Sequence, residues 1–495
     1  MAQKNLKQKA ASGMVWTALQ KYSMMIIQFI SGIILARLLT PYDYGCIGML
    51  AIFMVLAESF IDGGFGAALI QKKRPTQEDY STIFFWNLGM AGFMYVILFF
   101  CAPAISRFYN IPLLCSVLRV QGLLLFIYAF NVIQKNQLRK TLNFKVLSIV
   151  TITTSLISLG ITIFMAYKGF GVWALVTQNL ITAAIPAVVF WFYLKWRPIL
   201  VFSWKSFKEL FSFGFYMFLT HLLNSFGQQI QGLLIGKVYN PSTMGYYAKA
   251  HSVERIASTS VSSIMTQVTY PLYAEAQDNR QMMINMVKRL TMTLSYITFP
   301  IMFILILLAK PIFVLLYSER WLSSVPYFQV LCLAGLANCL MSVNLQTISA
   351  IGKSKIMFVW TVVKRVVGIG AIFVGLLLFG MKGLLAGVVI NNYFAYFVNI
   401  GLVSKHVGYK WTRQLWDLMP VTVASIVAAV VSYGCGYLLH LSMYPDGAVK
   451  LLVYMVVYLG WSFLFKPEAY TYSISIIPEK FRFWEKKGKR KSEEE

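Results

Sequence analysis

Ionisable residues inside apolar stretches are the part of this sequence that could do chemistry. His251, Glu254 and Arg255 lie within five residues of one another in a long, otherwise mostly uncharged segment. Inserting one such charge at the centre of a bilayer costs about 2.5–3.5 kcal/mol, so these residues normally face a bundle interior or a water-filled cavity. The sequence therefore predicts a wet cavity within a membrane, with Arg255 near the midplane.

Helical spacing collects further polar residues on single helix faces, because residues three or four apart lie above one another. Seven residues on or beside such stripes are predicted to line the cavity: Lys21, Gln28, Gln228, His251, Arg255, Lys364 and Arg365. Four more are predicted to couple transport to a proton or cation: Glu58, Asp62, Glu254 and His221. Polar stripes also join helices to one another, and Lys364 and Arg365 could instead reach the cytoplasmic interface, so structural roles stay open.

Two carboxylates share one helix face. Glu58 and Asp62 are four residues apart, and repulsion in a medium of low dielectric constant favours the neutral form of at least one of them. Lys21 is expected at a similar depth and is a potential partner of Glu58. Such a pair of acids could exchange a proton or bind a cation.

The elements that must position these groups are membrane helices. The chain has 495 residues, of which 58% are hydrophobic, with a mean hydropathy of +0.65 and a net charge of +26. A span needs about 20 apolar residues, and fourteen spans are predicted, at 14–36, 44–68, 82–104, 114–134, 146–167, 172–194, 210–236, 245–270, 290–316, 327–350, 357–380, 383–404, 417–440 and 447–465. By the positive-inside rule both termini are cytoplasmic, because about 30 of the 44 Lys and Arg fall on that side and only about nine on the other.

Other classes of protein are disfavoured. The sequence contains no P-loop, HExxH or GxSxG motif and no soluble segment long enough for a catalytic domain, so we expect no enzyme activity. The six cysteines lack CxxC spacing, which predicts neither a metal nor a disulfide framework, and no cofactor is expected. The basic residues are dispersed over short loops, which argues against nucleic acid, and the basic C-terminal tail is either solvated or lies on anionic lipid headgroups.

An internal repeat divides the chain. A shift of 200 aligns "GIILARLLTPYDYG" with "GLLIGKVYNPSTMG", pairing Pro41 with Pro241 and Gly45 with Gly245. Six spans per repeat give parallel repeats about an axis along the membrane normal. The predicted organisation is an N-terminal six-helix lobe at 1–200, a second six-helix lobe at 201–410, two additional helices at 411–467 and a basic cytoplasmic tail at 468–495.

Several segments resemble a known family. "SGMVWTALQKYSMMIIQFISGIILARLLTPYDYG", "DGGFGAALIQKK", "GFGVWALVTQNL" and "IGKSKIMFVWTVVKR" are similar to Wzx-type lipopolysaccharide and exopolysaccharide exporters, the polysaccharide transporter branch of the multidrug/oligosaccharidyl-lipid/polysaccharide (MOP) superfamily. The resemblance covers about residues 10 to 410 and weakens beyond Pro420. It implies an all-α flippase with two lobes in a V.

The resemblance also implies a substrate and a location. An undecaprenyl-diphosphate-linked oligosaccharide would cross the bacterial inner membrane for surface polysaccharide synthesis, with a polymerase and chain-length machinery as further partners. "YYAKAHSVERIAS" departs modestly from the family pattern, with fewer basic residues after the second hairpin, so the anion contact is less defined. The main alternative is a MATE-like ion-coupled exporter of cationic drugs, and a membrane polysaccharide polymerase or glycosyltransferase is a weaker one.

Overall fold

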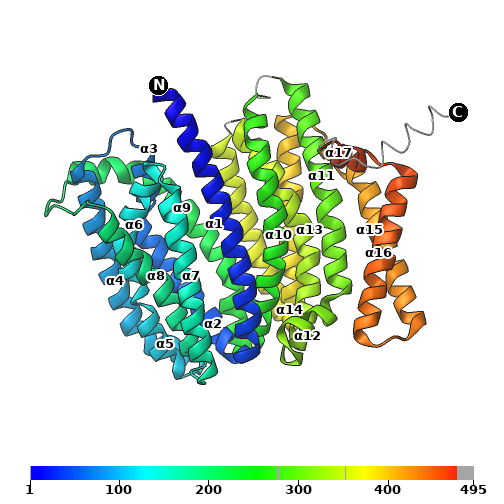
Figure 1. Ribbon diagram of the computed structural model, residues 1–495, viewed down its shortest axis with the longest axis horizontal. Helices are drawn as coiled ribbons and strands as arrows, with labels where there is room; N and C mark the ends of the chain where they lie inside the picture. The colour runs from blue at the N-terminus through cyan, green and yellow to red at the C-terminus, as the bar shows by residue number, and fades with distance from the viewer. Residues whose placement is uncertain (1, 276–278, 352, 477–495) are drawn as a thin grey trace. The chain divides into compact units, whose positions relative to one another are not determined.

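Helices make up the regular structure throughout the residues that the computed structural model describes, which are 2–275, 279–351 and 353–476. Figure 1 shows these helices with their labels. The first ten are α1 (Ala2–Leu38), α2 (Pro41–Asp62), α3 (Phe65–Gln71), α4 (Gln77–Tyr109), α5 (Leu113–Gln121), α6 (Leu124–Lys140), α7 (Phe144–Tyr167), α8 (Val172–Tyr193), α9 (Trp204–Val238) and α10 (Pro241–Glu275). The rest are α11 (Arg280–Leu307), α12 (Ala309–Tyr317), the 3-10 helix η1 (Glu319–Ser324), α13 (Val325–Ala350), α14 (Ser354–His406), α15 (Trp411–Leu439), α16 (Met443–Phe465) and α17 (Glu468–Ile476).

Eleven helical segments of the described residues are long and apolar enough to cross a membrane. α9 and α10 have 35 residues each, or about 50 Å at 1.5 Å per residue, but are not among the eleven. Three charged residues, Lys249, Glu254 and Arg255, interrupt α10. The all-helical membrane fold is therefore confirmed, and the number of fourteen spans stays a prediction.

The predicted spans at 357–380 and 383–404 are joined in α14. Gly380 has a φ of 58° and a ψ of −139°, which lies outside the helical region and reverses the chain. The two halves then pack as a hairpin so closely that a Cβ at Gly375 would overlap the carbonyl oxygen of Gly383, and a Cβ at Gly383 that of Gly375. α14 is thus two helices, as the sequence predicts.

The chain divides into two compact units. The first comprises residues Met1–Lys249 and Leu316–Trp321, and the second comprises Ala250–Leu315 and Leu322–Glu495. α9 belongs to the first unit because it packs on α2, α3 and α4. The predicted division is based on the sequence repeat, whereas the two units are defined by compactness. The lobes at 1–200 and 201–410 and the added helices at 411–467 therefore stay a prediction. Most of the predicted tail at 468–495 lies outside the described residues.

α2 is central to the first unit. It packs against α4, α6, α8 and α9, whereas α1 packs mainly on α7. The Ser148 hydroxyl fixes α1 to α7 by donating to the carbonyl oxygen of Trp16 at 3.0 Å. Phe65, Phe84 and Phe207 form part of a buried core near the α2–α3 turn.

The two repeat hairpins have equivalent bounds and touch each other within the first unit. α1 and α9 end at Leu38 and Val238, and α2 and α10 begin at Pro41 and Pro241. A Cβ at Gly45 would overlap the carbonyl oxygen of Pro241, and a Cβ at Gly245 that of Pro41. The residues that reveal the repeat in the sequence therefore form a reciprocal contact between its two copies.

Candidate functional site

The acids of α2 lie where that helix ends. Gly63 and Gly64 take φ values of 52° and 76°, which end α2 and begin α3. The Asp62 carboxylate accepts backbone hydrogen bonds from Gly64 and Gly66 at the start of α3. Glu58, one turn earlier, is half-buried. The α2–α3 turn thus fixes the carboxylate of Asp62, with Glu58 one helical turn before it.

α6 brings cations and a phenol to these acids. Lys135 lies within electrostatic range of Glu58, and Arg139 within range of Asp62. Tyr128 interacts electrostatically with both carboxylates. Arg139 is exposed, whereas Lys135 and Tyr128 are half-buried. The site is therefore a mixed-charge cluster open on one side.

His221 of α9 completes the cluster. Its Nδ1 lies 3.2 Å from the Ser59 hydroxyl and 3.4 Å from the Ser225 hydroxyl, and its ring is within electrostatic range of Asp62. The structure thus brings together three of the four predicted coupling residues, Glu58, Asp62 and His221. We call Glu58, Asp62, Tyr128, Lys135, Arg139 and His221 the α2 cluster.

Lys21 is the expected charged partner of Glu58, but the structure places Lys135 near it instead. Lys21 is exposed on α1. Because α1 packs on α7 and not along α2, the charged neighbour of Glu58 in the described structure is Lys135. Gln28 of α1 and Gln228 of α9 are also exposed.

Sequence reasoning missed the contribution of α6. The span predicted at 114–134 places Lys135 and Arg139 in the loop that follows it, but α6 continues to Lys140. The signal was present, since Tyr128, Lys135 and Arg139 recur at helical steps of seven and four residues on one face. Hydropathy falls near residue 134, before the helix ends, so the apolar pattern alone does not reveal the last turns of α6.

The charged residues of α10 in the second unit differ in their exposure. Glu254 is only 5% exposed, and its Oε1 lacks a hydrogen-bond partner in the described structure. This carboxylate packs so closely on α13 that a Cβ at Gly335 would lie 2.6 Å from Oε1. Arg255 is exposed, and His251 is half-buried within electrostatic range of it. Adjacent residues of one helix thus present a buried acid and an accessible cation.

Lys364 and Arg365 lie in the first half of α14, both half-buried. The Lys364 ammonium donates to the Asn399 side-chain oxygen at 2.8 Å, across the α14 hairpin. This contact gives Lys364 a structural partner.

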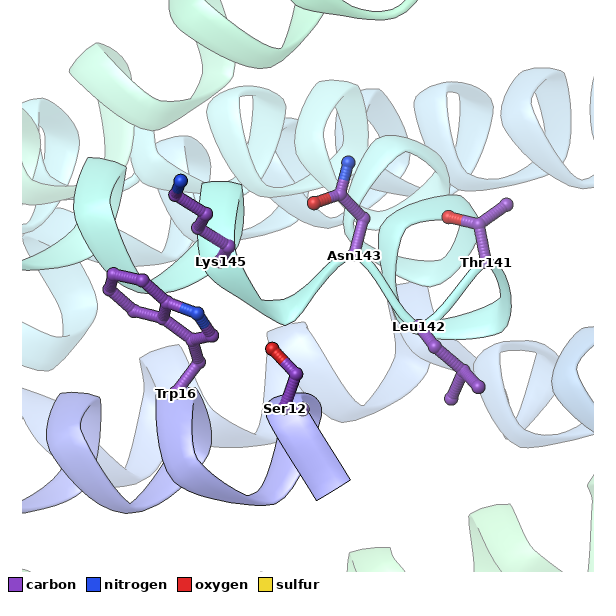
Figure 2. Close-up of a pocket in the computed structure, with 7 residues that line it drawn as sticks. Ser12, Trp16, Thr141, Leu142, Asn143 and Lys145 are labelled. Carbon is purple, nitrogen blue, oxygen red and sulfur yellow. The ribbon is translucent and has the colours of Figure 1, made fainter. Parts of the chain in front are cut away.

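A pocket of about 330 Å³ lies beside α1 and the α6–α7 loop (Figure 2). Trp16, Asn143 and Lys145 are among the residues that line it, and the Lys145 ammonium lies 5.7 Å from the centre of the Trp16 ring. None of the predicted cavity or coupling residues lines this pocket.

The arrangement suits binding and proton exchange. Carboxylates, an imidazole and cations meet in one accessible cluster, and a second, buried carboxylate lies on α10. In the described residues, groups of three or more His, Cys, Asp or Glu side chains placed to hold a metal ion are absent. Ionisable groups within membrane helices commonly mark the substrate and ion pathways of membrane transporters.

Comparison with known proteins agrees with this class. A family model described as "Polysaccharide biosynthesis protein" matches residues 34–326, so the chain belongs to that family. It is 26% identical over 358 residues to the teichuronic acid biosynthesis protein TuaB of Bacillus subtilis, covering 72% of this chain and 74% of that protein. It is 24% identical over 447 residues to the lipopolysaccharide biosynthesis protein WzxC of Escherichia coli, covering 88% and 89%.

Solved structures show the same fold. The lipid II flippase MurJ in an inward closed conformation matches with a TM-score of 0.73 and 15% identity, covering 91% of this chain and 98% of that one. An inward-facing MATE family multidrug transporter of the MOP superfamily matches with a TM-score of 0.62 and 15% identity, covering 80% and 98%. The predicted MOP fold and the resemblance to Wzx-type proteins are confirmed.

Proposed function

We propose that this protein is a flippase that moves an undecaprenyl-diphosphate-linked oligosaccharide across the bacterial inner membrane for surface polysaccharide synthesis. The observation that carries the proposal is the α2 cluster, in which ionisable groups of both signs lie accessible within apolar helices. Membership of a polysaccharide biosynthesis family adds the substrate class. The anionic, hydrated headgroup of such a lipid cannot cross hydrocarbon unaided, and cations in a wet cavity offset its charge.

The residues divide into two roles under this proposal. Arg255 and Lys21, both exposed, bind the diphosphate. The remaining cavity residues are Gln28, Gln228, His251, Lys364 and Arg365. The coupling residues are Glu58, Asp62, Glu254 and His221, and burial of Glu254 fits exchange of a proton better than contact with a sugar. No residue has a catalytic role.

The alternative is a MATE-like exporter of small cations, which shares the fold. Relatives named for polysaccharide biosynthesis, and accessible cations beside the acids, favour the flippase. A polymerase or glycosyltransferase is a weaker alternative. In the proposed setting both termini are cytoplasmic, and a polymerase and chain-length machinery act on the product.

Complementation tests the proposal. Cells that lack their own flippase for a surface polysaccharide should regain polymer at the surface when this chain is expressed with the matching glycosyltransferases. Surface polymer would be measured by lectin binding, and resistance to cationic dyes in the same cells. Dye resistance without polymer would favour the MATE-like alternative and overturn the proposal.

A further inference from the structure

Lys249 is a buried cation in an aromatic cage, within the first compact unit. Its side chain is 5% exposed, and its ammonium donates to the carbonyl oxygen of Gly32 at 2.7 Å. The ammonium lies 4.2 Å from the centre of the Tyr317 ring, 5.2 Å from Tyr44 and 5.6 Å from Trp321. Every ion pair found in the described residues lies elsewhere. The charge of Lys249 is thus stabilised by a carbonyl and by rings, without a carboxylate.

Two of the caging rings come from a short strap, residues Leu316–Trp321. The strap belongs to the first unit, although the residues on either side of it belong to the second. Arg37 Nε donates to the Leu316 carbonyl oxygen at 3.0 Å, and Trp321 Nε1 donates to that of Ala36 at 2.8 Å. Trp321 is fully buried, and Ser318 takes a φ of 78° that a non-glycine residue adopts only when its neighbours hold it. The strap is therefore pinned to α1 at both ends.

The repeat shows that packing does not require this charge. A shift of 200 pairs Lys249 with Met49. Lys249 of α10 lies against Gly32 of α1, whereas Met49 of α2 lies against Gly236 of α9, four residues beyond the twin of Gly32. Met49 is fully buried. An apolar side chain of similar length thus occupies the twin position, one helical turn from the equivalent glycine. The ammonium of Lys249 costs free energy in hydrocarbon, and Met49 does not.

A phosphate is a stronger partner for this ammonium than its present ones. The present hydrogen bond has one ionised partner, the ammonium, and a neutral carbonyl acceptor, and the cation–π contacts add weaker attraction. A phosphate oxygen would add the Coulomb attraction of a full opposite charge. An anion that reaches Lys249 only when the strap has moved would favour the released conformation, by its difference in affinity for the two conformations.

We propose that Lys249 and the strap form an anion-released latch: the cage holds the strap closed, and phosphate groups of the substrate replace the cage as partners of Lys249. This rests on the proposed function for the identity of the anion, a lipid diphosphate. In the proposed topology the latch lies at the extracytoplasmic end, where the two hairpins turn.

Accessibility of Ala36 reports the latch, because this residue is fully buried and its carbonyl bonds Trp321. The full chain carrying Ala36→Cys, without the accessible cysteines Cys101, Cys115 and Cys435, would be placed in nanodiscs and labelled with a water-soluble maleimide. Undecaprenyl diphosphate should raise the labelling rate about fivefold or more, the lower end of typical couplings. Neutral undecaprenol should not. Inorganic pyrophosphate that also raises labelling would support recognition of the anion without the lipid.

Lys249→Met, which installs the residue of the twin position, should accumulate normally and lose the response to the diphosphate. Lys237→Met is the matched control: Lys237 donates to the Phe108 carbonyl oxygen at 2.8 Å and lies 4.3 Å from the Phe108 ring, but it is exposed. Its response should persist. Trp321→Phe should raise labelling without any anion, which checks that Ala36→Cys folds and reports the strap.

A diphosphate response that survives in Lys249→Met, or an equal response to undecaprenol, would overturn the latch. The assay uses no sugar and no transport. A chain that shows the response but fails to restore surface polymer would therefore sink the proposed function and leave the latch standing.

Discussion

The α1–α2 hairpin and the α9–α10 hairpin share one construction but differ in charge. Both turn at the same proline and touch reciprocally through the same glycine. Several positions pair an uncharged residue in one copy with a charged residue in the other, among them Met49 with Lys249, Met54 with Glu254, Val55 with Arg255 and Ser258 with Glu58. The proline and glycine of the turn are thus retained in both copies, whereas the charges differ, as expected if the two copies serve distinct steps of the proposed transport.

The reciprocal glycine contact is the shared part, and breaking it should have the largest effect. Gly45→Ala and Gly245→Ala would each force a Cβ into backbone of the other hairpin, with no flexible side chain to yield. We expect each to destabilise the protein by about 1–3 kcal/mol or more, and to similar extents. Thermal unfolding in detergent would measure this.

Gly89→Ala is the control for those variants, because a Cβ there meets nothing within 4 Å. It should leave stability unchanged or raise it by about 0.5–1 kcal/mol, as alanine does within helices. Equal unfolding temperatures for Gly45→Ala and Gly89→Ala would show that the hairpins do not touch in this way.

Arg255 distinguishes the second hairpin, since its twin is Val55. Arg255→Ala should lower transport at least about tenfold, the equivalent of one lost charge-assisted contact of roughly 1.4 kcal/mol or more, while the protein accumulates normally. Arg255→Lys should keep partial activity if a point charge suffices and little if the contact is bidentate. Surface polymer is the measurement.

Arg107→Ala is a matched control for Arg255, because Arg107 is an exposed arginine near the end of α4. It should retain full transport. Loss of the protein itself in Arg255→Ala would instead point to a structural role for that residue.

The acids distinguish the first hairpin. Glu58→Gln combined with Asp62→Asn keeps hydrogen bonding and removes ionisation. We expect a severalfold slower transport that no longer responds to proton or sodium gradients, because Lys135 and Arg139 would lose their anionic partners. Vesicles with imposed gradients provide the readout, and a wild-type response would make these acids structural.

How far the sequence predicts this site depends on the residue. Periodicity identifies Glu58, Asp62 and His221, and the structure brings them together. The polar face of an otherwise apolar helix packs toward the polar faces of its neighbours, which collects these residues in one place. It misses Lys135 and Lys249 for different reasons. Lys135 lies where hydropathy fades before the helix ends, and the cage of Lys249 depends on a strap about 70 residues away. Periodicity shows which residues share a helix face but not which helix packs against that face. The expected pair of Lys21 with Glu58 therefore could not be predicted from it.

The smallest effect concerns an ion cluster outside the membrane spans. Lys72 lies 3.0 Å from both the Asp79 and the Glu209 carboxylates. Burial disfavours its charge, but hydrogen bonds to Glu209 and Asp79 outweigh this and raise the pKa of Lys72 above its usual 10.5. Its stabilisation is therefore present at neutral pH and is lost as pH rises through the raised pKa.

Lys72→Met should cost about 0.5–1 kcal/mol at pH 7, the range of partly exposed pairs. The difference from the wild type should shrink above pH 10.5. Denaturant unfolding at both pH values would check it, and a difference that grows with pH would have the wrong sign.

Flipping of a lipid-linked oligosaccharide in vesicles that contain only this protein tests the central claim most directly. Fluorescent undecaprenyl-diphosphate oligosaccharide would be incorporated in both leaflets, and a membrane-impermeant quencher added outside. The account predicts that quenching proceeds beyond the outer half with the wild type and stops at about half with Arg255→Ala over the same time. Quenching that stops at half with the wild type, under every gradient applied, would contradict it.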